Sequence, residues 1–198
     1  MKIPKKFRKS LEWLIPIFII GTLYFTGLWP EVAGALQSLV VRSGLVNPSI
    51  ERSEDLGTIS TDFTLESIDG NFLSSNDLKG KIVFINLWAT WCPPCIAEMP
   101  EIEDLYEELK NEKNIEFVML NLDQNRNKAL EFISRKELNI PVYFKASALP
   151  PELTVHSIPT TFVIDPEGKI IFKHSGIASY NNEEFKSFLK AGKKVKKS

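Results

Sequence analysis

The sequence predicts an α/β fold, in which helices cover both faces of a central sheet, preceded by a membrane-spanning helix at the N-terminus. Three observations support this prediction. Residues 13–30 contain no charged side chain, residues 82–88 form an almost continuous apolar run, and strand-like and helix-like patterns alternate between residues 61 and 192. Eighteen uncharged residues form a helix of about 27 Å, close to the roughly 30 Å of a bilayer core. An alternation of strands and helices is typical of a sheet covered by helices.

The composition excludes several classes of protein. The 198 residues are 43% hydrophobic and 25% charged, which is ordinary for a globular chain and allows one domain with an appendage. Residues 51–192 hold 14 basic and 23 acidic residues, a net charge of −9, so this part of the chain would repel nucleic-acid phosphates. The two cysteines, Cys92 and Cys95, are too few for a multi-disulfide scaffold or a four-cysteine zinc site. We therefore expect neither a nucleic-acid partner nor a metal.

The first 30 residues are predicted to be a signal anchor. Residues 1–10 hold five basic residues and no acidic one, so they are expected to stay in the cytoplasm while residues 11–30 cross the membrane once. The rest of the chain then lies on the periplasmic or extracytoplasmic side of the cytoplasmic membrane. The small residues at 33–35 leave open a removable signal peptide, cleaved after Ala35, which gives the body of the chain the same location.

Residues 31–60 are predicted to be a linker, because they contain three glycines and a proline among mixed polar residues. The apolar residues between 32 and 41 leave open a short amphipathic helix on the membrane surface. Residues 61–192 are predicted to form the folded domain, and the four lysines of residues 193–198 a solvated basic tail.

The elements of the domain follow from hydrophobic periodicity. A hairpin is expected around a turn at Asp69-Gly70, and the apolar run at 82–88 is typical of a strand buried on both faces. The other predicted elements are helices at 96–109, 128–137 and from 182, and strands at 117–122, 142–144, 161–164 and 170–173.

The motif Trp91-Cys92-Pro93-Pro94-Cys95 lies between the buried strand and the long helix. A cysteine at a helix N-terminus faces unpaired N–H groups and the positive end of the helix dipole, which stabilise the nucleophilic thiolate. Cys92 is therefore predicted to attack, and Cys95, one turn deeper, to resolve the mixed disulfide. Two prolines fit the first turn of a helix, where their missing N–H groups have no intrahelical partner. A purely structural disulfide and a metal site are the alternatives.

Four segments carry a resemblance to a known family: Asp62-Phe63-Thr64-Leu65, residues 84–100 (FINLWATWCPPCIAEMP), residues 158–162 (IPTTF) and residues 164–170 (IDPEGKI). Together they resemble the thioredoxin superfamily, and more closely its membrane-anchored thiol-disulfide reductases of the TlpA, ResA and DsbE (CcmG) type. The resemblance extends over roughly residues 60–192. It implies a thioredoxin-like fold with a central mixed sheet, and thiol-disulfide exchange outside the cytoplasmic membrane.

The resemblance also implies roles for single residues. Cys92 and Cys95 match the redox pair, and Pro159 matches the cis-proline that faces it. Glu98 matches an acidic residue near the pair, which is expected to exchange a proton with Cys95. Contacts with a bound partner are expected from Trp91, Pro93, Pro94 and Ile158.

One position departs from cytoplasmic thioredoxin, which has a buried Asp six residues before its first cysteine. This chain has Asn86 there, and an amide cannot titrate, so the proton is shuttled by Glu98, by water or by no group at all. His156, three residues before Pro159, is expected to be an exposed loop residue.

The function implied by the resemblance is the reduction of disulfides in envelope proteins, apocytochrome c among them, with electrons supplied by a membrane protein. The redox-active disulfide is then the only redox group, without a further cofactor. A DsbA-like oxidant is the first alternative, because the potentials of Cys-x-x-Cys proteins span about −270 to −120 mV. A redox-silent binding module or metallochaperone is the second. A peroxiredoxin-like peroxidase is disfavoured, since the chain lacks a Thr-x-x-Cys motif.

Overall fold

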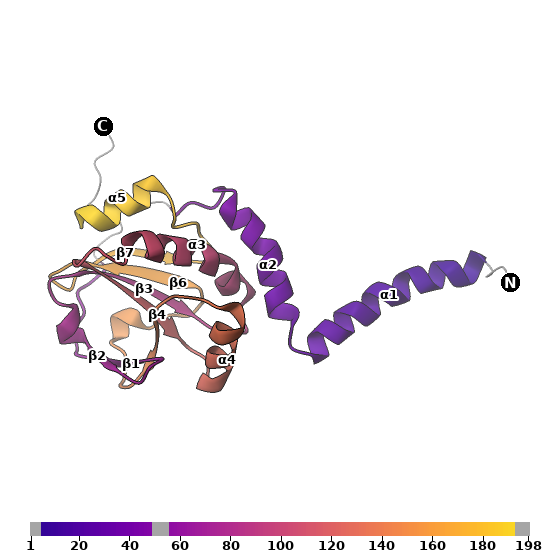
Figure 1. Ribbon diagram of the computed structural model, residues 1–198, viewed down its shortest axis with the longest axis horizontal. Helices are drawn as coiled ribbons and strands as arrows, with labels where there is room; N and C mark the ends of the chain where they lie inside the picture. Colours follow the sequence, from indigo (N-terminus) through magenta and orange to yellow (C-terminus); the bar gives the residue numbers. More distant parts are fainter. Residues whose placement is uncertain (1–4, 49–55, 193–198) are drawn as a thin grey trace.

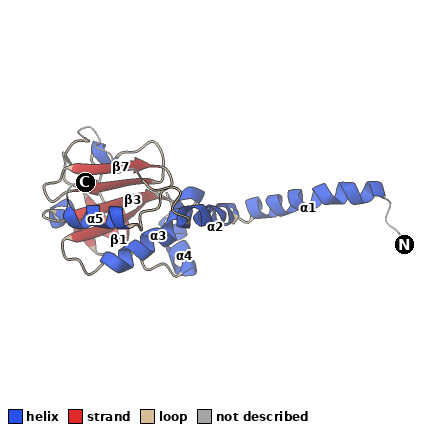
Figure 2. Cartoon of the chain, turned by 90° about the horizontal axis from the view of Figure 1, so that it is seen from above, coloured by secondary structure: helices blue, strands red, loops and turns tan. Residues whose placement is uncertain are grey.

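A computed structural model describes residues 5–48 and 56–192 of the chain, with side chains from residue 13 onward. The start of the predicted basic segment, residues 49–55 of the predicted linker and the predicted basic tail lie outside the described residues. Figure 1 shows a body of sheet and helices, from which helix α1 (Lys5–Phe25) projects. Figure 2, turned by 90°, shows the same projection of α1 away from the body.

The body is built on a seven-stranded mixed sheet in the order β2-β1-β5-β4-β3-β6-β7. At its centre, the fully buried strand β3 (Ile82–Trp88) pairs in parallel with β4 (Ile115–Asn121) and antiparallel with β6 (Thr160–Ile164). The other strands are β1 (Thr64–Ser67), β2 (Phe72–Ser74), β5 (Val142–Lys145) and β7 (Ile170–Ser175). The mixed sheet that the family resemblance implies is confirmed.

Two apolar clusters cover the two faces of the sheet, because successive residues of a strand point to opposite faces. The even-numbered apolar residues of β3 pack with helices α3 (Pro93–Leu109), α4 (Arg126–Lys136) and α5 (Glu183–Ala191). The odd-numbered ones pack with apolar residues of the short 3₁₀ helices η1 (Ser75–Leu78) and η2 (Pro151–Leu153) and of the loops beside them. The α-helices thus cover one face, on which Asn86 also lies. In the part of the chain that the structure describes, only short 3₁₀ helices lie on the other face, where the sequence predicted helices as well.

Helix α1 ends before the boundary that the sequence predicted for the membrane segment. Gly27 has a φ of 73°, and the N–H groups of Gly27 and Leu28 donate to the carbonyls of Tyr24 and Leu23. This is a Schellman cap, which glycine favours because it adopts positive φ without strain. The predicted segment 11–30 is therefore not one helix: α1 stops at Phe25, and α2 (Trp29–Arg42), with Pro30 in its first turn, starts in a new direction.

A membrane span needs a helix that is both long and apolar. Within the described residues no single helix meets this requirement, whereas Trp13–Phe25 and Trp29–Arg42 meet it only as a pair bent by 108°.

Helix α2 occupies residues that the sequence predicted to be a linker, and it packs against α3 (Figure 1). The contact is close because Gly34 lies against α3: a Cβ at this position would stand 2.8 Å from Ile96 Cβ and 2.9 Å from the Pro93 carbonyl oxygen. Glu31 adds ion pairs to Arg135 and Lys136 at the end of α4. Residues 31–42 therefore form a docked helix rather than a free tether, and the missing side chain of Gly34 has a packing role.

We expect Gly34→Ala to detach α2 from α3, although alanine favours a helix over glycine by about 1 kcal/mol. The added methyl group meets backbone and a β-branched side chain, so overpacking should lower the free energy of unfolding by about 1–3 kcal/mol. Hydrogen exchange of the α2 amides should accelerate. Gly21→Ala is the matched control, because a Cβ at Gly21 meets nothing within 4 Å. Equal exchange in the two variants would contradict this packing.

Candidate redox site

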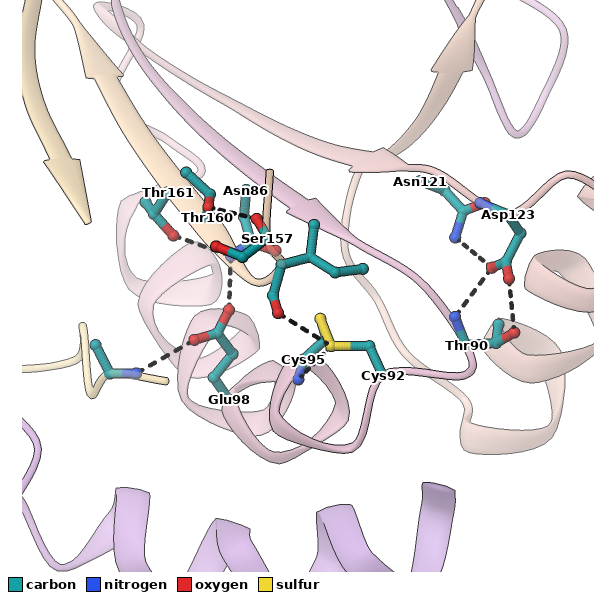
Figure 3. The surroundings of a disulfide bond; sticks show 12 residues. Asn86, Thr90, Cys92, Cys95, Glu98, Asn121, Asp123, Ser157, Thr160 and Thr161 are labelled. Atoms are coloured by element: carbon teal, nitrogen blue, oxygen red, sulfur yellow. Dashed lines mark hydrogen bonds between the residues drawn. A yellow bond between two sulfur atoms is a disulfide. The ribbon is translucent and has the colours of Figure 1, made fainter. Parts of the chain in front are cut away.

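The two cysteines form a disulfide at the N-terminus of α3, where β3 ends and the helix begins (Figure 3). Cys92 is the N-cap residue, and its Sγ accepts a hydrogen bond of 3.2 Å from the Cys95 N–H. Both side chains are buried. The strand positions this site, because the continuous apolar run of β3 holds residues 82–88 inside the sheet and leaves the motif at its carboxyl end.

The loop before β6 closes one side of the disulfide. The Ile158–Pro159 peptide bond is cis, and the Ile158 carbonyl oxygen lies 3.7 Å from Cys92 Sγ. The disulfide sulfur has no proton, so this is a contact; in the dithiol the Cys92 S–H can donate to the same oxygen. The structure therefore brings Pro159 and Ile158 to the sulfur pair, as the resemblance implied.

Glu98 is buried on the turn of α3 that follows Cys95 (Figure 3). Its Oε1 accepts a 2.7 Å hydrogen bond from Asn86 Nδ2, and its Oε2 accepts one of 3.3 Å from the Ala178 N–H. Burial raises the pKa of Glu98 to about 8, although both hydrogen bonds act in the opposite direction. The carboxyl group is thus largely protonated at neutral pH and can gain or lose a proton near it.

Asn86 links Glu98 to β6, since its Nδ2 also donates to Thr161 Oγ1 at 2.9 Å. Its Oδ1 is buried and has no hydrogen-bond partner among the described residues. The two ends of an amide have nearly the same shape, so the Oδ1 of a rotated Asn86 can accept a hydrogen bond from the O–H of a neutral Glu98. Asn86 can therefore form a hydrogen bond with either protonation state of Glu98 without changing its own charge.

A second polar cluster holds the loop that leads into the motif. Asp123, just after β4, accepts hydrogen bonds of 3.0 Å from both the N–H and the Oγ1 of Thr90, and one of 2.8 Å from Asn121 Nδ2 (Figure 3). Sequence reasoning missed this cluster. The one available signal was that two parallel strands, ending at Trp88 and Asn121, bring the residues after them to the same edge of the sheet.

We expect Asp123→Ala to loosen the loop that carries Cys92, since the half-buried Thr90 N–H and hydroxyl lose their partner. Loss of such a hydrogen-bonded group costs about 1–3 kcal/mol, and disulfide exchange should slow because the sulfur is held less firmly. Urea unfolding and the rate of reduction by dithiothreitol measure the two effects. Asp165→Ala is the control: Asp165 accepts hydrogen bonds from the Glu167 and Lys169 N–H groups in the turn after β6, at the end of β3 opposite the motif, so its loss should lower stability without changing that rate. Unchanged values for Asp123→Ala would show that the cluster does not position the loop.

The other predicted residues divide between surface and core. Trp91 is 60% exposed beside the motif, whereas Trp88 is completely buried and packs on Phe132 of α4. Pro93 and Pro94 are half-buried in the first turn of α3, and His156 is exposed. Tyr180, which sequence reasoning did not select, is buried near Glu98; burial and the charge of Glu98 raise its phenol pKa.

Comparisons with known proteins agree with this geometry. A sequence profile of the AhpC/TSA family matches residues 56–173. The chain is 33% identical to thiol-disulfide oxidoreductase ResA of a Bacillus cereus strain over 135 residues, 68% of this chain and 76% of the relative. It is 34% identical to ResA of Bacillus subtilis (strain 168) over 116 residues, 58% of this chain and 64% of the relative.

A solved thiol:disulfide interchange protein of the thioredoxin family from Chlorobium tepidum TLS is similar in structure. The TM-score is 0.56 at 26% identity, and the match covers 72% of this chain and 99% of the other.

A cysteine pair at the start of a helix, on a thioredoxin-like sheet and opposite a cis-proline, defines a thiol-disulfide oxidoreductase. The chain belongs to the AhpC/TSA family, and its relatives of the ResA type carry the same activity in their names.

Proposed function

We propose that this oxidoreductase reduces disulfides of exported proteins, with the catalytic domain outside the cytoplasm and α1 as its membrane anchor. Apocytochromes, whose haem-binding cysteines must be kept reduced, are the substrate class that the family resemblance suggests. A protein within the membrane would supply the electrons that restore the dithiol. The observation that supports reduction of substrates, rather than their oxidation, is the set of groups around Cys92 Sγ.

A strongly oxidising pair needs a reduced form that is stabilised as the thiolate. Here Pro93 and Pro94 supply no N–H in the first turn, so the donor to Cys92 Sγ is the Cys95 N–H, at 3.2 Å. The Ile158 carbonyl points its oxygen, the negative end of the C=O dipole, at the sulfur from 3.7 Å. This favours the thiol over the thiolate. Weak stabilisation of the thiolate supports a reductase rather than a DsbA-like oxidant.

The anchor is supported by the side chains of α1. From Trp13 to Phe25 the apolar residues are largely exposed, among them Phe18 and Phe25 at 76% and 88%, and the segment contains no charge. Thirteen residues span about 20 Å, and a hydrophobic stretch shorter than the bilayer core is accommodated by local thinning of the bilayer.

Equilibration against dithiothreitol buffers tests the direction. The fraction of Cys92–Cys95 disulfide, measured by alkylation of the full chain in detergent, should give a reduction potential below about −200 mV, in the range of thioredoxin and glutaredoxins. A potential near −120 mV, the value typical of DsbA, would refute the reducing direction and leave the exchange activity intact.

A further inference from the structure

Helix α2 has two different faces, and only one of them is covered. The covered face carries Glu31, Gly34, Ser38 and Val41, which recur at intervals of three and four and are buried or half-buried. A helix repeats every 3.6 residues, so these positions form one stripe. Through this stripe α2 rests on α3 and forms its ion pairs with α4.

The opposite face is apolar and exposed. It consists of Trp29, Val32, Leu36, Leu39 and Val40, with exposed fractions of 39% to 69%. Their spacing again follows the helical repeat, and the stripe contains no charged side chain. A contiguous apolar surface of this kind marks an interaction site.

The position of α2 in the chain indicates what covers this face. It follows α1 after a break of three residues, at an angle of 108°. A helix crossing a bilayer along its normal would therefore leave α2 nearly parallel to the membrane surface. Continuation of α2 through the bilayer is incompatible with its docked face, because Glu31 and Gly34 are held against α4 and α3.

Resting on the anchor proposed above, we propose that α2 lies in the lipid interface of the outer leaflet, with its apolar stripe in the bilayer and its other face carrying the catalytic domain. Helices of this kind bury one apolar face at the boundary between headgroups and acyl chains. Tyr24 and Trp29, exposed on the two sides of the bend, are aromatic residues of the type that prefers the headgroup level.

The proposal places the redox site at the membrane surface. The residues at the bend, Tyr24, Gly27 and Trp29, line one cavity together with Thr90 and Trp91. Trp91 immediately precedes Cys92. Trp91, the exposed residue beside the buried disulfide, is thus held next to the headgroups, where a partner embedded in the same membrane can reach it.

Spin-label accessibility tests the position of α2 in the full chain. Single cysteines are introduced as Leu36→Cys and, in a separate variant, Phe72→Cys, both in a Cys92→Ser, Cys95→Ser background. Each is labelled with a nitroxide and reconstituted into phosphatidylcholine vesicles. Phe72 lies on β2 of the sheet and is 69% exposed, which makes it the aqueous control. We expect the label at 36 to collide several-fold more often with oxygen than with a water-soluble nickel chelate, and the label at 72 to show the reverse.

Three outcomes would overturn the proposal. If the label at 36 is as accessible to nickel as the label at 72, the α2 face lies in water. If it is protected from both reagents, and neighbouring labels broaden each other's spectra, a second copy of the chain covers the face. If the protein does not float with the vesicles at all, the anchor fails as well. Disulfide exchange in solution is measured separately, so failure of the membrane position and failure of the reductase function are distinguishable.

Discussion

Cys92→Ser is expected to reduce thiol-disulfide exchange to the rate measured without protein. Cys92 is the N-cap of α3 and the residue next to the Ile158 carbonyl, so its sulfur is the one that a bound disulfide meets. In the reaction the Cys92 thiolate forms a bond to one substrate sulfur, and the other substrate sulfur leaves as a thiolate. Cys95 then attacks Cys92, which releases the second substrate thiol and leaves the Cys92–Cys95 disulfide. Reduction of insulin or of a disulfide peptide measures the loss.

Cys95→Ser is the matched variant, because it keeps the attacking sulfur and removes only the resolving one. We expect it to lose turnover as well, but to accumulate a mixed disulfide with substrate on Cys92, visible by non-reducing electrophoresis and mass spectrometry. Such adducts also identify the partner proteins. If Cys92→Ser accumulated the adducts and Cys95→Ser did not, the order of attack derived from the geometry would be reversed.

Glu98→Gln is expected to change how stability depends on pH. The folded protein raises the pKa of Glu98 from 4.5 to about 8, because burial disfavours its charge, whereas the unfolded chain titrates near the ordinary value. Between these two pH values the folded chain keeps the Glu98 proton and the unfolded chain has lost it. The free energy of unfolding therefore contains a contribution that falls with rising pH. The slope is about 1.4 kcal/mol per pH unit, and it vanishes below about pH 4.5 and above about pH 8.

Gln removes the titration while it keeps the hydrogen bonds, since its amide can donate to a rotated Asn86 and accept from the Ala178 N–H. Urea unfolding at a series of pH values should therefore show the wild-type chain losing stability relative to Glu98→Gln as the pH rises from 5 to 8. Glu184→Gln, at an exposed position of α5, removes the same formal charge and should retain the wild-type slope. Parallel curves for the wild type and Glu98→Gln would show that Glu98 is ionised throughout this range.

Glu98→Gln also tests whether Glu98 takes part in proton transfer to or from Cys95. If Glu98 exchanges a proton with Cys95, the step in which Cys95 attacks should slow and lose its pH dependence near pH 8. The position of Glu98 beside the motif follows from the helical repeat. The helical repeat does not predict which groups surround the Glu98 carboxyl, because Asn86 lies on β3 and Ala178 lies beyond β7.

Local patterns predicted the central strand and the redox motif well. The strand Ile82–Trp88 was predicted with its observed bounds, because a continuous apolar run with a turn and a helix signal on either side has few other interpretations. The motif had to lie at the start of α3 for the same reason. The N-terminal elements were harder, since the pattern at residues 31–42 fits a tether, a cleavage site or a packed helix equally well.

The sequence by itself predicted a thiol-disulfide oxidoreductase with an apolar N-terminal segment, because the Cys92–Cys95 motif and the uncharged run at residues 13–30 are each made of close neighbours in the chain. Only the tertiary structure decided that α2 docks on α3, that Asp123 holds Thr90, and that Asn86 and Ala178 surround Glu98. Each of these contacts joins residues far apart in the sequence. Whether they form depends on how the sheet and helices pack, which local spacing does not encode.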